Sequence, residues 1–140
     1  MRSLFQTSFI VRVGEINYGG HMGNDKYLLL FQDARIRFLE WLGFSERAIG
    51  DGTGVIMSEA HLNFRVELFL SDRLTVAVRP AKIGASRFVL EYEVRRDGEE
   101  TAAATGTTTL AAFDYQKRRI TRIPASFRRA LEGCLTGGTD

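Results

Sequence analysis

The sequence predicts an α+β fold in which an antiparallel sheet wraps around one long central helix. Three observations carry this prediction. A strand pattern opens the chain, a long apolar helical pattern follows it, and the remainder alternates in the manner of successive strands. Strands joined by short turns pair antiparallel, and curling such a sheet around an apolar helix buries both elements.

The first strand is expected from Leu4 to Val13, where apolar and polar residues alternate. A glycine-rich stretch, Gly14 to Gly23, interrupts this pattern. The helix is expected from Asn24 to Leu42, because Asn caps helices well and Asp25 suits the first turn. Gly43 is well placed to end it. The apolar stripe of this helix is wide enough to predict that the sheet encloses it (Tyr27, Leu28, Leu30, Phe31, Ala34, Phe38, Leu39, Trp41 and Leu42).

The rest of the chain predicts a meander of strands. Residues 56–68 alternate between an apolar and a polar face, and further strands are expected at 73–83, 87–96, 100–114 and 119–123. A second helix is expected from Pro124 to Leu131. We find no internal repeat, low-complexity tract or linker. Residues 1–140 are therefore expected to form a single domain.

The composition narrows the function classes. A formal net charge of +2 is too weak to indicate nucleic-acid binding, although it would not repel a polyphosphate ligand. No apolar run reaches the roughly 18 residues of a membrane helix, and the first residues lack the pattern of a signal peptide. A lone cysteine, Cys134, suits a reducing compartment. We therefore expect a cytoplasmic protein with no membrane or nucleic-acid partner.

The stretch VRVGEINYGGHMGNDKYLLLFQDARIRFLEWLGF (residues 11–44) resembles the opening of hotdog-fold thioesterases of the 4-hydroxybenzoyl-CoA thioesterase-like branch. That opening is a strand, the motif D-x-D-x-x-G-H-V-N-N-x-x-Y, and a helix that contains E-x-A-R. Residues at motif positions are Glu15, Asn17, Gly20, His21, Met22, Gly23, Asn24 and Tyr27, with Asp33-Ala34-Arg35 on the helix signature. The resemblance implies the hotdog fold, acyl-CoA thioester hydrolysis without a cofactor, and a homodimer or a dimer of dimers with sites between subunits.

One departure from the motif concerns the chemistry directly. The second acid of D-x-D is the usual catalytic carboxylate of the family, and this chain has Asn17 there. An amide has no useful basicity and cannot form an acyl-enzyme, so that role does not carry over. Asn17 can still orient a water molecule or donate a hydrogen bond to the thioester oxygen. The alternative is that Asn17 only satisfies backbone groups of the loop.

Glu15 and His21 are the candidate bases. If the strand stays extended, Glu15 and Asn17 point to the same side, and Glu15 activates a water that Asn17 holds. Alternatively, Glu15 ties down the glycine-rich loop. Related acyl-carrier-protein thioesterases give a histidine at the position of His21 a proposed catalytic role, but their preceding asparagine is Gly19 here. His21 is otherwise a loop-organising residue. Gln32 and Asp33 are further candidates, since another hotdog branch keeps its catalytic acid on this helix.

Backbone groups supply the other half of the predicted site. Unpaired N–H groups at a helix N-terminus polarise a thioester carbonyl and stabilise the oxyanion formed on attack. The resemblance implies this role for the N–H groups of Gly23 and Asn24. Alternatively, Asn24 is only the helix cap. No second ligand stands at metal-binding spacing from His21, so we expect no metal.

The substrate contacts are predicted more loosely. The acyl tail is expected along Tyr18, Met22 and Tyr27. The candidates for the phosphates of coenzyme A are Arg65, Arg73, Lys82 and Arg87. For each cation the alternative is ordinary surface charge. The alternative for the whole chain is a hotdog protein that binds acyl thioesters without hydrolysing them.

Overall fold

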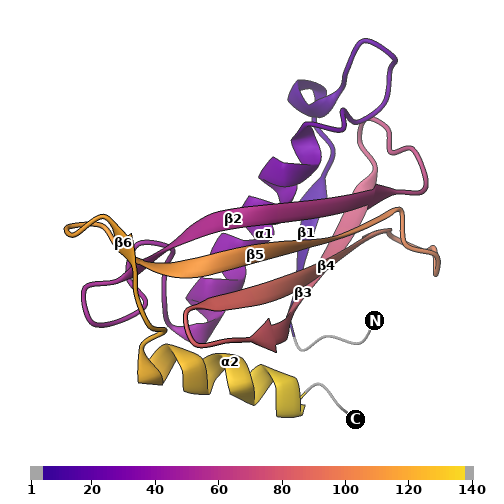
Figure 1. Ribbon diagram of the computed structural model, residues 1–140. Coiled ribbons are helices and arrows are strands. Elements are labelled where there is room, and N and C mark those ends of the chain that lie inside the picture. The colour runs from indigo at the N-terminus through magenta and orange to yellow at the C-terminus, as the bar shows by residue number, and fades with distance from the viewer. Residues whose placement is uncertain (1–4, 138–140) are drawn as a thin grey trace.

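A curved antiparallel sheet wraps around helix α1 (Lys26–Leu42) in the computed structural model, which describes residues 5–137 (Figure 1). A second helix, α2 (Ala125–Gly137), lies against strand β3. This arrangement confirms the predicted α+β class, with a sheet around a long helix in the manner of a hotdog. None of the helices in the described part of the chain is long and apolar enough to span a membrane.

The sheet has the strand order β1-β3-β4-β5-β2, with every neighbouring pair antiparallel. The strands are β1 (Phe5–Ile10), β2 (Gly54–Phe64), β3 (Arg73–Ile83), β4 (Arg87–Arg96), β5 (Ala104–Asp114) and the short β6 (Arg119–Ile120), which pairs with β5. Strands β1 and β2 therefore form the two edges of the sheet. The bounds of β3 and β4 are those that the sequence predicts.

The first strand ends earlier than predicted. Its predicted start, Leu4, lies outside the described residues. Strand β1 stops at Ile10, and the chain then tightens into the short 3-10 turn η1 (Val13–Glu15). The predicted strand is therefore interrupted before Glu15, while Ile16, between Glu15 and Asn17, is extended again and pairs with Met22.

Strand β2 also differs from its prediction. Its pairing with β5 shifts register between Met57 and Glu59, so the predicted alternation of faces does not hold along its whole length. Ile56, which the simple alternation assigns to the apolar face, is consequently half exposed. The strand ends at Phe64, where the N–H groups of Arg65 and Val66 both donate to the carbonyl of Ala103 and the chain leaves the sheet.

Helix α1 packs closely against Gly106 on β5 through the ring of Phe31. A Cβ at that position would lie 2.5 Å from Cε2 of Phe31 and 2.7 Å from the carbonyl oxygen of His61. The ring of Phe31 stacks on Tyr92 with ring centroids 4.3 Å apart. The absence of a side chain at Gly106 thus lets an aromatic pair hold the helix against the strands.

A buried polar cluster ties the same helix to the sheet. The Arg35 guanidinium, only 6% exposed, pairs with Glu46 at 2.5 Å and donates to the Tyr92 hydroxyl at 3.2 Å. Tyr92 in turn lies 2.7 Å from the Thr108 hydroxyl. Burial raises the pKa of the Tyr92 phenol, although Arg35 and Thr108 act in the opposite direction.

Candidate active site

The loop between β1 and α1 is anchored to the protein by Met22. Its N–H donates to the carbonyl of Leu68 at 2.7 Å, and its side chain is 1% exposed within the core. Inside the loop, the N–H of Asn17 donates to the carbonyl of His21 at 2.9 Å. The buried side chain of Met22 and its backbone bond to Leu68 together fix the loop, and its predicted contact with the acyl tail stays a prediction. The loop in turn holds the N-terminus of α1 in place.

The two predicted backbone donors have different surroundings. The N–H of Gly23 donates to the carbonyl of Glu15 at 2.9 Å, so it is already used inside the loop. The N–H groups of Asn24 and Asp25 have no acceptor among residues 5–137. Both residues therefore offer an open donor at the start of the helix, and Asn24 is the one of the two that lines a pocket.

The helix cap is not where the sequence predicts it. The N-cap residue of α1 is Asp25 rather than Asn24, and its carboxylate makes no capping hydrogen bond. Instead it lies over Gly23, where a Cβ would meet Asp25 Oδ1 at 2.7 Å and Asn17 Cβ at 3.4 Å. Its one ion pair is with Lys26, at 3.8 Å. The sequence pattern assigns Asp25 only to the helix start. The signal for its position beside the loop was Gly23, which stands where the family motif has an asparagine and leaves room for the carboxylate.

Glu15 is engaged by Arg12. One carboxylate oxygen accepts from the Arg12 backbone N–H at 2.7 Å, and both oxygens lie 3.3 Å from guanidinium nitrogens of the same residue. These contacts support the alternative in which Glu15 orders the loop. Glu15 faces a groove of about 620 Å³ between β1 and α1, to which Phe9, Leu29 and Arg73 also contribute.

Asn17 and His21 also bond within the loop. The Asn17 side-chain oxygen accepts from the Gly19 N–H at 2.9 Å, while its amide nitrogen has no acceptor in the described part of the chain. His21 Nδ1 lies 3.1 Å from the Met22 carbonyl, and Nε2 lies 3.6 Å from the Glu67 carboxylate. The ring is thus hydrogen-bonded to the loop backbone through Nδ1, as a loop-organising histidine would be, while the Asn17 amide keeps donors to offer.

A small pocket of about 140 Å³ adjoins Asn24. It is lined by His21, Met22, Asn24, Tyr27, Phe64, Arg65, Val66 and Glu67. The rings of Tyr27 and Phe64 meet edge to face at 5.0 Å, and burial raises the pKa of the Tyr27 phenol. Tyr27 and Arg65 are therefore brought to the predicted site. Tyr18 is fully exposed at the tip of the loop.

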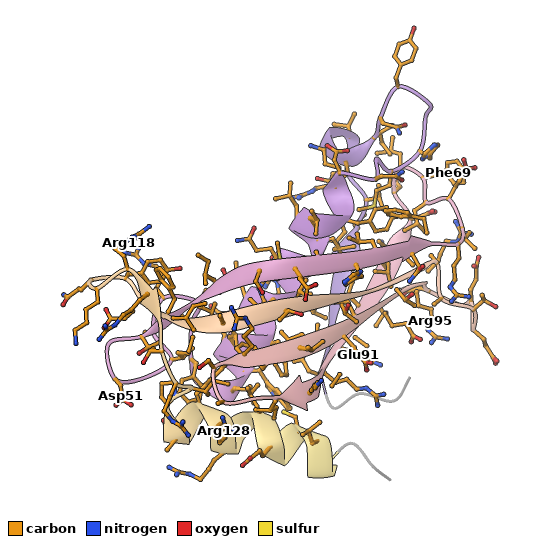
Figure 2. All side chains as sticks on the ribbon, in the orientation of Figure 1. Asp51, Phe69, Glu91, Arg95, Arg118 and Arg128 are labelled. Atoms are coloured by element: carbon orange, nitrogen blue, oxygen red, sulfur yellow. The ribbon has the colours of Figure 1, made fainter. Side chains whose placement is uncertain are left out.

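Lys82 and Arg87 are not brought to this site within one chain. The pairing of Ile10 with Arg73 puts the loop at the start of β3, whereas Lys82 lies nine residues further along that strand, about 30 Å away. The turn between Lys82 and Arg87 contacts α2 instead, where Arg128 donates to the Gly84 carbonyl (Figure 2). Their assignment to the phosphates of coenzyme A stays a prediction.

The helix candidates have other partners. The Asp33 carboxylate pairs with Arg37 at 3.2 Å, and the Gln32 amide donates to Glu46 at 3.5 Å. Between residues 5 and 137, no three histidine, cysteine or acidic side chains gather closely enough to hold a metal ion.

The chain belongs to the thioesterase-like superfamily, whose sequence profile matches residues 11–131. Among curated proteins, it is 29% identical over 122 residues to an L-carnitine dehydrogenase/betainyl-CoA thioesterase from Agrobacterium fabrum. That match covers 87% of this chain but 25% of the relative, so the chain spans about a quarter of that protein. It is also 21% identical to the long-chain acyl-CoA thioesterase FadM of Escherichia coli, covering 91% and 96% of the two chains.

The fold likeness extends to solved structures. The hypothetical protein SAV2348 from Staphylococcus aureus, solved in complex with CoA, superposes with a TM-score of 0.89. The match covers 100% of this chain and 89% of the other, at 22% identity. At this identity the likeness establishes the shared fold.

Proposed function

We propose that this protein is an acyl-CoA thioesterase, a single hotdog domain that hydrolyses an acyl-CoA thioester to the free acid and CoA. The observation that carries the proposal is the N–H of Asn24, which has no acceptor among residues 5–137 and lies beside a pocket at the N-terminus of α1. Membership of the thioesterase-like superfamily supports it. Thioester hydrolysis needs water as its only co-reactant, so we propose no cofactor. The lone cysteine fits our proposal of a cytoplasmic location.

In this proposal the backbone prepares the carbonyl for attack. The thioester oxygen accepts from the Asn24 N–H, and the positive end of the α1 dipole stabilises the charge that develops on it. The free amide donors of Asn17 hold the attacking water on the loop side. Tyr27 and Phe64 form an apolar wall for the acyl or pantetheine chain, and Arg65 is the cation nearest this pocket for a phosphate of CoA.

We propose a homodimer that pairs the two β2 edges. An edge strand presents unpaired backbone groups that a second copy can bond. Leu28, Leu29, Ile56 and Met57 remain exposed beside this edge and line an open cavity of about 360 Å³ between α1 and β2. A second subunit would cover this apolar surface. A dimer of dimers remains compatible with the same edge.

The second candidate function is an acyl-thioester-binding protein without turnover. The observation that favours it is Asn17, at the position where the family has its carboxylate. A thiol-release assay separates the two functions. The substrate panel is a betainyl-CoA, a long-chain acyl-CoA and 4-hydroxybenzoyl-CoA, tested on wild type and Asn17→Asp.

We expect wild type to release CoA from at least one member of the panel in excess of the enzyme concentration. If wild type only binds these thioesters while Asn17→Asp turns them over, the chain is a binding protein. If neither variant binds or hydrolyses any of them, both proposals fail.

A further inference from the structure

Asp25 departs from ordinary helix-cap behaviour. An aspartate at an N-cap position normally accepts a hydrogen bond from the N–H of the second or third helical residue. The Asp25 carboxylate makes no such bond, and its side chain is 78% exposed with Lys26 3.8 Å away as its ion-pair partner. The carboxylate is therefore turned away from the helix and available to water.

Gly23 makes room for this position of the carboxylate. Asp25 Oδ1 and the Asn17 side chain lie on the same face of Gly23, and any Cβ there would come within 2.7 Å of the carboxylate oxygen. A gap this short is not tolerated without a shift, so the carboxylate occupies the space of the absent side chain. The arrangement depends on glycine at this position.

Two departures from the family motif and one further acid therefore meet at one point. The motif's second acid is Asn17 here, its first Asn is Gly23, and the position after its second Asn carries Asp25. Losing an acid at position 17 removes the basic group of the site. Removing the side chain at position 23 admits another acid to the same surroundings, and Asp25 supplies it.

We propose that Asp25 is the general base of this thioesterase, taking the place of the carboxylate that the chain lacks at position 17. This inference rests on the proposed hydrolysis. Of the other acids near the loop, Glu15 is engaged by three contacts with Arg12, and the exposed Glu67 carboxylate lies 3.6 Å from His21 Nε2. Asp25 adjoins the residue with the open N–H, so base and oxyanion donor are consecutive in the chain.

The proposed step is balanced by water alone. The Asp25 carboxylate takes a proton from a water molecule as the water oxygen bonds to the thioester carbon. The carbonyl electron pair moves onto oxygen, where the Asn24 N–H holds the negative charge. The intermediate then collapses, the carbon–sulfur bond breaks, and the Asp25 proton passes to the leaving thiolate. Free acid and CoA are released, and the carboxylate is restored.

The test compares two Asp→Asn changes that alter the net charge equally. Asp25→Asn is expected to lower kcat by about 100-fold or more, with little change in the affinity for a non-hydrolysable thioether analogue of the substrate. Asp51→Asn is the control. Asp51 lies in an exposed turn at the end of the molecule opposite Phe69, the residue that follows the Leu68 anchor of the loop (Figure 2). Asparagine also tolerates the φ of 55° found there.

Two further variants make the result specific. Gly23→Ala should displace the carboxylate and lower kcat in the same way, with the overall fold checked by circular dichroism. Asn17→Asp combined with Asp25→Asn should regain turnover, because it returns an acid to the family position.

The outcomes separate this inference from the proposed function. If wild type hydrolyses a substrate and Asp25→Asn keeps its kcat, the base assignment is overturned while the thioesterase remains. If wild type releases no thiol from any substrate, the proposed function itself fails. If Asp25→Asn and Asp51→Asn lose activity equally, the effect belongs to net charge and the assignment also falls.

Discussion

At the scale of single residues, Glu15 and Asp25 illustrate how two acids ten positions apart acquire different roles. Glu15 is mostly buried and bonds both the backbone and the side chain of Arg12, whereas Asp25 is exposed, makes no capping hydrogen bond and has an ion pair with Lys26 at 3.8 Å. A base must give up its partners to accept a proton. The acid with fewer partners is therefore the better base.

We predict that Glu15→Gln lowers stability and leaves chemistry in place. The loss of the charged pair with Arg12 should reduce the free energy of unfolding by about 1 kcal/mol, measured by urea denaturation. The kcat should stay within a few-fold of wild type. Arg12→Gln removes the same pair from the other side and should behave alike. A hundredfold fall in kcat for Glu15→Gln with unchanged stability would instead identify Glu15 as the base.

The Tyr92 phenol should make stability fall in alkali. Burial raises its pKa above the ordinary value of 10.0, so the phenol ionises more readily in the unfolded chain than in the folded one. The contribution of the Tyr92 phenol to the free energy of unfolding is complete below pH 10 and declines as the pH rises through 10 toward the folded-state pKa. Urea denaturation at pH 9, 10 and 11 should show a steeper decline for wild type than for Tyr92→Phe. Tyr18→Phe, which removes an exposed phenol, should follow wild type.

At the scale of secondary-structure elements, the packing of α1 against β5 at Gly106 can be tested directly. Gly106→Ala should destabilise the fold by about 1–3 kcal/mol, because the new Cβ meets the Phe31 ring and the His61 carbonyl. Gly133→Ala is the matched control. It lies in α2 with nothing within 4 Å of its Cβ, and should stabilise the protein by up to about 1 kcal/mol. Equal melting temperatures for the two variants would contradict the close contact.

The bounds of a strand or helix can be predicted from the sequence when the interactions that set them are local. Strands β3 and β4 have their predicted bounds, because their alternation is unbroken and short turns flank them. The end of β2 is set by a distant group, the Ala103 carbonyl that accepts from the N–H groups of Arg65 and Val66. Residue patterns over a few positions do not contain such information.

The candidate site likewise combines features with local causes, which the sequence predicts, and features that depend on contacts between distant residues. The helix start beside Asn24 was predictable, because a glycine-rich stretch runs into an apolar helical pattern. The occupied N–H of Gly23 and the orientation of Asp25 depend on how the loop closes on itself. The positions of Lys82 and Arg87 depend on strand register.

At the scale of the whole molecule, the proposed dimer through β2 predicts that a charge placed beside this edge lowers the molecular mass of the protein in solution. Met57→Lys places a charge on the exposed apolar surface beside the β2 edge and should convert a dimer into a monomer of about 15.7 kDa. Light scattering coupled to size-exclusion chromatography measures this directly. Leu70→Lys, which adds the same charge at an exposed position in the loop before β3, should remain dimeric. A wild type that is already monomeric would refute the proposed dimer.

The open donor at Asn24 belongs to the main chain, and this has a consequence for how the protein tolerates change. Replacing the side chain at that position leaves the N–H in place, so an alanine scan would not detect the group that we propose to hold the oxyanion. Natural variants could likewise carry a different residue type at position 24, other than proline, and keep this N–H group. The chemistry is instead vulnerable through the residues that fix the backbone, above all Met22 and its bond to Leu68. This half of the site therefore depends on the conformation of the loop and not on the side chain at position 24.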